Sequence, residues 1–512
     1  MKETSRPAGL KVASERRFKT AFKDAAPSAV KRAGRSVRQF WPLAALLALM
    51  LALAVPAAVV VAPGFIGPEP PAAAPATPAW QLPPAALSAR QGLSPLTDSA
   101  PAPLPEAVTA QLDSLLKSDG DGSFTGLVQD ALTGNVLYDR GGSENRVPAS
   151  NMKLFTAVAA LRALGPDHRF STRVVAGSDA TKVVLTGGGD VLLSAGESAP
   201  DQVMGHAGLA SLAAATVAAL QANGTTGELS VLVDDSLFSG PALNPAWADG
   251  DVAAGEAAPL YPLALNSARY NPAVTTGPRP QDSAVTAAEA FAGQLKAAGA
   301  AAGLTVAAGV GRSAAPGTVN GATVQLAEVQ SATVAEQVGL MLESSDNYLA
   351  EVLGRMAAAA AGAPASNDGA TAAVRAQLAE LGIATPAMRF ADVSGLAMGN
   401  QASARQLADV VRAITTGTDR RLRAALDGFP VAALSGTLDA RYEDASTSRG
   451  AGLVRAKTGT LNSVIALSGY VVDADGRLLV FSFIGNGLTP GAAGNREAVD
   501  RAASALAACG CR

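Results

Sequence analysis

The chain has 512 residues, of which 48% are hydrophobic and 16% are charged. This length allows two or three domains, and this composition is not that of a disordered protein. The formal net charge of −3 excludes a chain built as a whole to bind nucleic acid.

The N-terminal part predicts a basic tail followed by a membrane anchor. Residues 1–40 carry eleven Lys or Arg against three Asp or Glu, a net charge of +8. Residues 41–62 contain no charge, and at about 1.5 Å per residue they can cross a bilayer core of roughly 30 Å. Because positive flanks stay inside, we expect a single-pass protein of the cell membrane with a cytoplasmic tail and an extracellular domain. A cleavable signal peptide, after which the protein would be secreted, is the alternative, although both parts are long for one.

The two ends of the exported part carry little further information. Residues 63–107 are rich in Pro and Ala, which predicts a semi-extended linker between the membrane and a folded domain. The only cysteines are Cys509 and Cys511. We therefore expect a frayed C-terminus and a domain that does not depend on disulfides.

The folded part begins near Val108 and alternates between helical and strand patterns. A helix, a hairpin turning at residues 133–135 and a second helix come first. Short strands with one Ala-rich helix then dominate residues 172–325. Helices and a final set of strands follow. This order predicts an α/β (α+β) domain, formed by residues 108–171 and 326–512, with a strand-rich inserted domain over 172–325.

A serine and a lysine stand three residues apart at the start of the helix predicted over residues 151–164. Residues i and i+3 share a helix face, so Ser150 and Lys153 can touch. A lysine with an ordinary pKa of about 10.4 is no base at neutral pH, but burial or a second cation lowers that pKa. The helix N-terminus also offers N–H groups to an oxyanion. His168 and His206 have no nucleophile elbow to serve, and we interpret each as a surface or structural histidine.

Two further motifs lie downstream. Ser345-Asp346-Asn347 interrupts a helical apolar pattern, and short polar residues prefer helix caps and turns. This turn is either a plain N-cap or a turn that presents Ser345 and Asn347 to a cleft. Lys457-Thr458-Gly459 opens a strand-like run, where the glycine allows a close approach to the strand.

The motifs Ser-x-x-Lys, Ser-Asp-Asn and Lys-Thr-Gly occur here in that order, which is typical of class A β-lactamases and penicillin-binding proteins. From about residue 112 to 506, the chain resembles the serine D-alanyl-D-alanine carboxypeptidases/endopeptidases, the class C low-molecular-mass penicillin-binding proteins. Stretches such as LTGGGDVLL and DVSGLAMGNQASARQLADVV add to the resemblance. Ser150 and Ser345 are 195 residues apart, which fits the subfamily with a β-rich insertion between the first two motifs of a penicillin-binding/β-lactamase-like transpeptidase domain.

The chain departs from this family at three places. Val191 and Val393 stand where Pro and Gly are usual. After residues 265–280 the sequence passes almost directly to the Ala-rich helix, so a β-rich subdomain often found there is expected to be lost or much shortened. None of these departures touches the three motifs.

The resemblance implies a serine D-Ala-D-Ala carboxypeptidase mechanism, possible also on cross-links, acting on peptidoglycan stem peptides. Ser150 would attack the penultimate D-Ala carbonyl and Lys153 would take its proton. Ser345 would relay a proton to the leaving amine, oriented by Asn347 and Lys457. Penicillin and other β-lactam antibiotics would acylate the same serine.

The resemblance also implies where the substrate binds. Lys457, Thr458, Gly459 and Thr460 would hold it, with the terminal carboxylate on the first two and an oxyanion hole from the backbone N–H groups of Ser150 and Thr460. No cofactor and no metal are implied. The loop residues Asp392, Ser394 and Gly395 are expected to be structural.

Two other functions are compatible with the sequence. A β-lactamase or esterase could share the fold, but no glutamate is placed as a dedicated deacylating base. A non-catalytic scaffold that binds the cell wall could retain the fold without the chemistry. The intact set of motifs argues against the scaffold.

Overall fold

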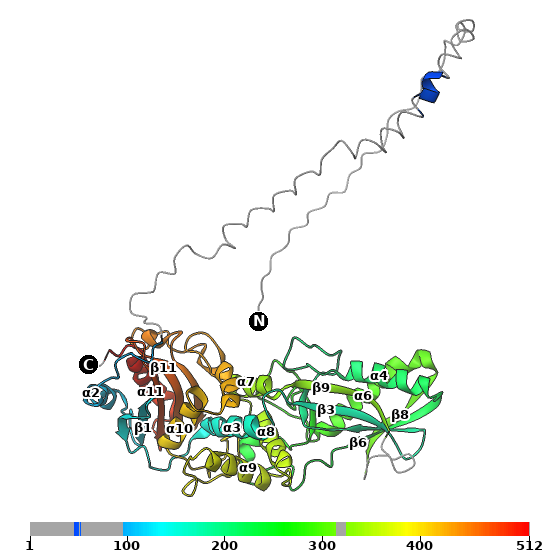
Figure 1. The fold of residues 1–512 in the computed structure, drawn as a ribbon. Coiled ribbons are helices and arrows are strands. Elements are labelled where there is room, and N and C mark those ends of the chain that lie inside the picture. The colour runs from blue at the N-terminus through cyan, green and yellow to red at the C-terminus, as the bar shows by residue number, and fades with distance from the viewer. Residues whose placement is uncertain (1–45, 51, 53–95, 314–323, 511–512) are drawn as a thin grey trace, which may run out of the picture. The chain divides into compact units, whose positions relative to one another are not determined.

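The computed structural model describes residues 46–50, 52, 96–313 and 324–510. The predicted basic tail, residues 1–40, lies outside the described residues, and so does the predicted anchor, residues 41–62, apart from 46–50 and 52. No helix among the described residues combines the length and the apolarity needed to cross a bilayer. Every described strand belongs to the unit formed by Ser88–Arg512 (Figure 1).

The first domain is built on a five-stranded antiparallel sheet that joins both ends of the folded chain. Its strand order is β10-β11-β12-β1-β2. Strands β1 and β12 pair from Ser123 opposite Asn486 to Asp130 opposite Leu479. The bounds are β1 Ser123–Asp130, β2 Val136–Arg140, β10 Arg455–Leu461, β11 Val464–Val472 and β12 Leu478–Asn486.

Helices cover both faces of this sheet, which explains why its central strands are apolar at nearly every position. On β12, Phe481 and Phe483 pack in one core with α2 (Pro105–Leu115) and α11 (Ala492–Ala507). Val480 and Ile484, on the other face, belong to the core that contains α3 and α10. The helices of that second layer are α3 Met152–Ala163, α7 Val334–Ser344, α8 Asn347–Ala360, α9 Asn367–Glu380 and α10 Ala404–Thr415.

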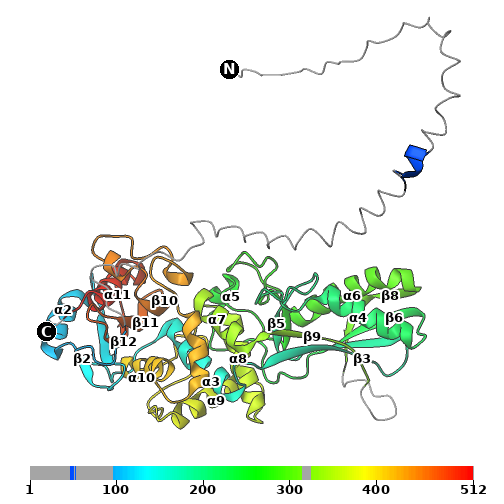
Figure 2. The ribbon, with the colours of Figure 1, turned by 45° about the horizontal axis from the view of Figure 1, so that its top comes forward.

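The inserted domain has its own five-stranded sheet, of which β3, β6, β8 and β9 are labelled in Figure 2. The strand order is β8-β6-β4-β3-β9. The domain runs from Arg169 to Thr333, slightly beyond the predicted range of 172–325. Strands β4, β6 and β8 are parallel, and parallel neighbours require crossover connections, here through helices. The bounds are β3 Arg169–Ala176, β4 Lys182–Thr186, β5 Asp190–Leu193, α4 Leu209–Ala222, β6 Gly227–Asp234, α5 Asp249–Ala253, β7 Leu263–Leu265, α6 Ser283–Gly299, β8 Leu304–Arg312 and β9 Gln325–Thr333.

Three expectations from the sequence are wrong in detail. The inserted domain has more than one helix, because α4 makes the crossover between β4 and β6. The last part of the predicted linker, residues 63–107, is packed on the first domain, since Arg477 donates to the carbonyls of Asp98 and Ala100. Cys509 is buried and disulfide-bonded, so the chain is not frayed there.

Candidate active site

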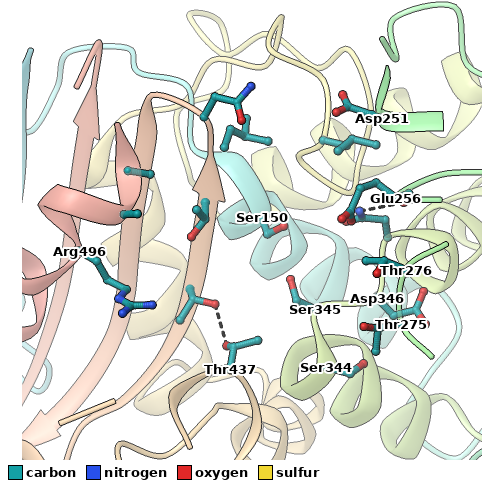
Figure 3. Close-up of a pocket in the computed structure, with 18 of the residues that line it drawn as sticks. Ser150, Asp251, Glu256, Thr275, Thr276, Ser344, Ser345, Asp346, Thr437 and Arg496 are labelled. Atoms are coloured by element: carbon teal, nitrogen blue, oxygen red, sulfur yellow. Dashed lines mark hydrogen bonds between the residues drawn. The ribbon is translucent and has the colours of Figure 1, made fainter. Parts of the chain in front are cut away.

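A cleft of about 890 Å³ lies where the first domain meets the start of α8 and a loop of the inserted domain. Five of the predicted site residues line this cleft: Ser150, Ser345, Asn347, Thr458 and Thr460. Figure 3 shows Ser150 and Ser345 facing the same space. The structure therefore brings all three sequence motifs together.

Ser150 lies in a 3-10 turn, η2 (Ala149–Asn151), directly before α3. The preceding Ala149 is buried and has a φ of 47°, in the left-handed region. A non-glycine residue adopts that conformation only where the surrounding structure enforces it. The turn presents the serine at the helix N-terminus, as the sequence predicts, but the left-handed alanine has no signal in the sequence.

Lys153 is completely buried behind Ser150. Its Nζ donates to Ser150 Oγ at 3.0 Å, to Asn347 Oδ1 at 2.6 Å and to the Ser394 carbonyl at 2.8 Å. Burial lowers the pKa of this amine to about 8, although the nearby carboxylates, with Asp392 first, act in the opposite direction. A lysine with such a pKa is partly neutral near physiological pH and can accept the proton of a serine.

The turn between α7 and α8 carries the second motif. Ser345 is the C-cap of α7 and has a φ of 58°, in the left-handed region. Asp346 is the N-cap of α8, because its side chain accepts from Leu349 N. Asn347 is the first residue of α8. The turn is thus both a helix cap and a cleft wall, so the two interpretations of this motif are compatible.

Lys457 reaches the same region from β10. It is buried, and its Nζ donates to Ser345 Oγ at 2.9 Å and to the Thr458 carbonyl at 2.8 Å. Burial lowers the pKa of this amine well below its ordinary value, and the neighbouring Lys153 lowers it further. Each of the two serines therefore has one buried lysine as its hydrogen-bond partner.

The rest of the third motif serves two different purposes. A Cβ added to Gly459 would lie 2.7 Å from Asn151 Nδ2 and 2.9 Å from the Pro148 carbonyl. The close approach that this glycine permits is therefore to the protein's own nucleophile turn, and Gly459 is absent from the residues that line the cleft. Thr458 and Thr460, one on each side of it, line the cleft.

The loop predicted to be structural is indeed ordered by Asp392. This buried carboxylate accepts from Trp247 Nε1, Gly395 N, Ala397 N and Asn400 Nδ2. The loop nevertheless belongs to the site, because the Ser394 carbonyl is one of the three acceptors of Lys153. Glu351 of α8 holds the loop from the other side by accepting from Val393 N and Ser394 N.

The structure adds residues that the motifs do not indicate. Asn347 Nδ2 donates to the Glu256 carbonyl at 3.0 Å, and Arg269 forms a buried ion pair with Asp346 at 2.8 Å. Glu256 and Arg269 both belong to the inserted domain. Thr437 Oγ1 lies 2.7 Å from Thr458 Oγ1.

The two histidines of the chain lie outside this cleft. Neither His168 nor His206 is among its lining residues; His206 lies instead against Arg169. In the part of the chain that the structure describes, no three His, Cys, Asp or Glu side chains come together as a metal site.

Comparison with known proteins identifies the family. A profile of the D-Ala-D-Ala carboxypeptidase 3 (S13) family matches residues 108–285 and 275–507. The chain belongs to this S13 family. Its relatives include a carboxypeptidase of Mycobacterium tuberculosis, 37% identical over 433 residues, which cover 84% of this chain and 90% of the relative. Carboxypeptidase DacB of Mycolicibacterium smegmatis is 37% identical over 91% of this chain and 96% of its own length.

A solved structure shows the same fold as this S13 chain. Penicillin-binding protein 4 of Haemophilus influenzae aligns with a TM-score of 0.62 at 21% identity, covering 78% of this chain and 99% of that protein. The same protein complexed with a β-lactam aligns with a TM-score of 0.53 over 77% of this chain and 97% of that one. The predicted α/β fold class, the predicted family and the predicted serine D-Ala-D-Ala carboxypeptidase class of enzyme are thereby confirmed.

Proposed function

We propose that this S13 enzyme hydrolyses the terminal D-Ala-D-Ala bond of peptidoglycan stem peptides, or the equivalent D-Ala cross-link, through an acyl-enzyme on Ser150. The observation that carries the proposal is the pairing of two serines with two buried lysines in one cleft. Lys153 contacts Ser150 at 3.0 Å and Lys457 contacts Ser345 at 2.9 Å.

Acylation begins with the neutral amine of Lys153. It takes the proton of Ser150 Oγ while that oxygen attacks the carbonyl carbon of the penultimate D-Ala. The negative charge that develops on the carbonyl oxygen is held by the backbone N–H groups of Ser150 and Thr460. Because Lys153 also donates to Asn347 and to the Ser394 carbonyl, its position is fixed before the substrate arrives.

Collapse of the tetrahedral intermediate breaks the peptide C–N bond and leaves an ester on Ser150. The leaving amine must gain a proton, which Ser345 Oγ supplies from its position beside Lys457. Water then attacks the ester, and the reverse proton transfers return Ser150 to its resting form. The substrate's terminal carboxylate lies against Thr458 and Thr460, on the side of β10 that lines the cleft.

β-Lactams are expected to acylate Ser150 in the same way and to remain attached. Among the described residues, the hydrogen bond to Ser150 Oγ comes from an amine, that of Lys153, rather than from a carboxylate. The match to the D-Ala-D-Ala carboxypeptidase family supports a penicillin-binding enzyme over a β-lactamase.

We also propose an extracytoplasmic location, with residues 41–62 as the membrane anchor and residues 1–40 in the cytoplasm. The net charge of +8 before an uncharged stretch of 22 residues supports this orientation. The test is membrane fractionation followed by protease treatment of spheroplasts. Release of the cleft-bearing domain from a membrane-retained N-terminus supports the anchor, and a soluble mature protein that begins after residue 62 contradicts it.

The test of the chemistry is covalent labelling of the full-length protein with a fluorescent penicillin. We expect stable labelling that Ser150→Ala abolishes. Ser114→Ala is the matched control, because Ser114 and Lys117 repeat the Ser-x-x-Lys spacing at the C-terminal end of α2 and just after it. Its labelling must equal that of the wild type. Label that is lost within seconds indicates a β-lactamase, and absence of label on folded wild type contradicts an acylating enzyme.

A further inference from the structure

Thr437 lies outside the three motifs and yet touches one of them. It belongs to η5, a 3-10 turn formed by Gly436–Leu438, and it lines the cleft. Its Oγ1 is 2.7 Å from Thr458 Oγ1, the contact drawn as a dashed line in Figure 3. Thr458 itself is largely buried.

The turn that carries Thr437 is anchored at its start. Ser435 Oγ accepts from Val431 N, and Ala433 N donates to the Leu438 carbonyl at 2.9 Å. Gly436 has a φ of 57°, and a Cβ there would lie 2.7 Å from the Glu343 carbonyl at the end of α7. The turn therefore packs against the C-terminal end of α7, next to Ser345.

The segment after the turn is anchored to the opposite wall of the cleft. Arg441 forms a buried ion pair with Asp500 of α11 through two of its nitrogens. Before the turn, Ala432 and Val454 are joined by a backbone hydrogen bond next to β10. With both flanks held, the Thr437 side chain has a defined place beside the strand that carries the third motif.

Two hydroxyl groups in contact share their protons in a restricted way. Each has a single proton to donate, so one hydroxyl donates to the other and only the second keeps a proton for a ligand. A carboxylate can only accept hydrogen bonds. Thr458 can therefore donate to a carboxylate in the cleft only if its own contact with Thr437 is one in which Thr437 donates.

We propose that Thr437 is a positioning residue, which donates to Thr458 Oγ1 and so directs the Thr458 hydroxyl proton toward the substrate's terminal carboxylate. This inference rests on the proposed function. A hydroxyl that already accepts a hydrogen bond is a stronger donor, and a hydrogen bond to a charged acceptor is stronger than one between neutral groups. Thr437 thus contributes to selection for a free C-terminal carboxylate without contacting the scissile bond.

The test compares two acylating agents on the full-length protein, benzylpenicillin and its methyl ester, which lacks the charged carboxylate. Thr437→Val keeps the shape of the side chain and removes the hydroxyl, whereas Thr437→Ser keeps the hydroxyl. We expect Thr437→Val to lower the second-order rate constant of acylation by the acid about 10-fold and by the ester less than about twofold. Thr437→Ser stays within about twofold of the wild type for both agents.

Two results would overturn the inference. Equal rates for Thr437→Val and wild type with the acid mean that the contact does not matter, and parallel losses with acid and ester mean a merely structural role. If Thr437→Val does not fold, as judged by its melting temperature, Thr437→Ala is measured with the same pair of agents and the same criteria. Absence of acylation in the wild type itself contradicts the proposed function, and that outcome is distinct from a changed ratio in the variants.

Discussion

The two serines of the cleft are held in place by different parts of the molecule. Ser150 and Lys153 are fixed within the first domain, by one helix turn and by the Ser394 carbonyl. The turn with Ser345 is fixed largely from the inserted domain. The Asp346 carboxylate accepts hydrogen bonds from two residues of the inserted domain, Arg269 at 2.8 Å and Ser267 at 2.9 Å.

This difference shows that the inserted domain completes the site. Asn347, which contacts Lys153, is itself oriented by the Glu256 carbonyl. The next residue, Tyr348, is buried and its hydroxyl lies 2.9 Å from Ser283 Oγ at the start of α6. A change in the inserted domain can therefore reach Lys153 through the hydrogen bonds of Asn347, and experiments can separate the two supports.

The largest effect is expected inside the first domain. Lys153→Met preserves the length of the side chain and removes the amine that contacts Ser150. Since general-base catalysis contributes about 10²–10⁴-fold, acylation by a fluorescent penicillin is expected to fall about 10³-fold. Stopped-flow labelling measures it, with the half-exposed Lys182→Met of the inserted domain as a control of unchanged rate. A loss below about tenfold would exclude Lys153 as the base.

A smaller effect is expected when the ion pair between the inserted domain and the Ser345–Asn347 turn is removed. Arg269→Met leaves Asp346 as a buried carboxylate without its cation, and breaking a buried pair from one side costs about 3 kcal/mol of unfolding free energy. Denaturant unfolding measures that loss, and labelling measures the accompanying fall in acylation. The double variant Arg269→Met/Asp346→Asn removes the unpaired charge and is expected to recover stability; a further loss in the double variant would contradict this account.

The inserted domain also has a pH response of its own. Burial raises the pKa of Asp190 from 3.8 to about 7, and its Oδ2 has no hydrogen-bond partner in the described structure. The folded state then retains a proton that the unfolded state releases, so stability present below pH 4 is lost as pH rises through about 7. Over this range the unfolding free energy of the wild type is expected to fall by about 4 kcal/mol. Asp190→Asn stays neutral, and its unfolding curves should change less between pH 5 and 8; equal changes in both proteins would refute the assignment.

The smallest effect concerns the pH dependence of acylation. Only neutral Lys153 accepts a proton, so the rate is expected to rise with pH through about 8. Glu351 raises the pKa of Lys153, together with Asp392, Asp346 and Glu256. Glu351→Gln keeps an acceptor for the backbone of the Ser394 loop and removes the charge.

The rising limb of Glu351→Gln is therefore expected to move to lower pH by a few tenths of a unit. Glu380→Gln, on the exposed end of α9, is the control with an unchanged limb. If the rising limb of Glu351→Gln moves to higher pH, Glu351 does not raise the pKa of Lys153, and the assignment is wrong.

The sequence predicts contacts well where they are local and poorly where they depend on packing. The pairing of Ser150 with Lys153 follows from helix periodicity alone. The pairing of Lys457 with Ser345 joins residues 112 positions apart, and only a resemblance to a family could suggest it. No sequence motif indicates Arg269 or Thr437, because each acts through one side-chain contact that forms only in the folded chain. Helix α4 was missed because its Ala-rich sequence has no clear polar face, and the parallel order of β4 and β6 cannot be read from composition.

The chain enters and leaves the inserted domain through neighbouring strands. Arg169, at the start of β3, is opposite Thr333, at the end of β9, and Thr333 caps the helix that leads to Ser345. Residues inserted or deleted beyond the β3–β9 pair would leave the two junctions unchanged. The distal part of the insertion can therefore differ in length without displacing Glu256 and Arg269, which contact the turn that carries Ser345.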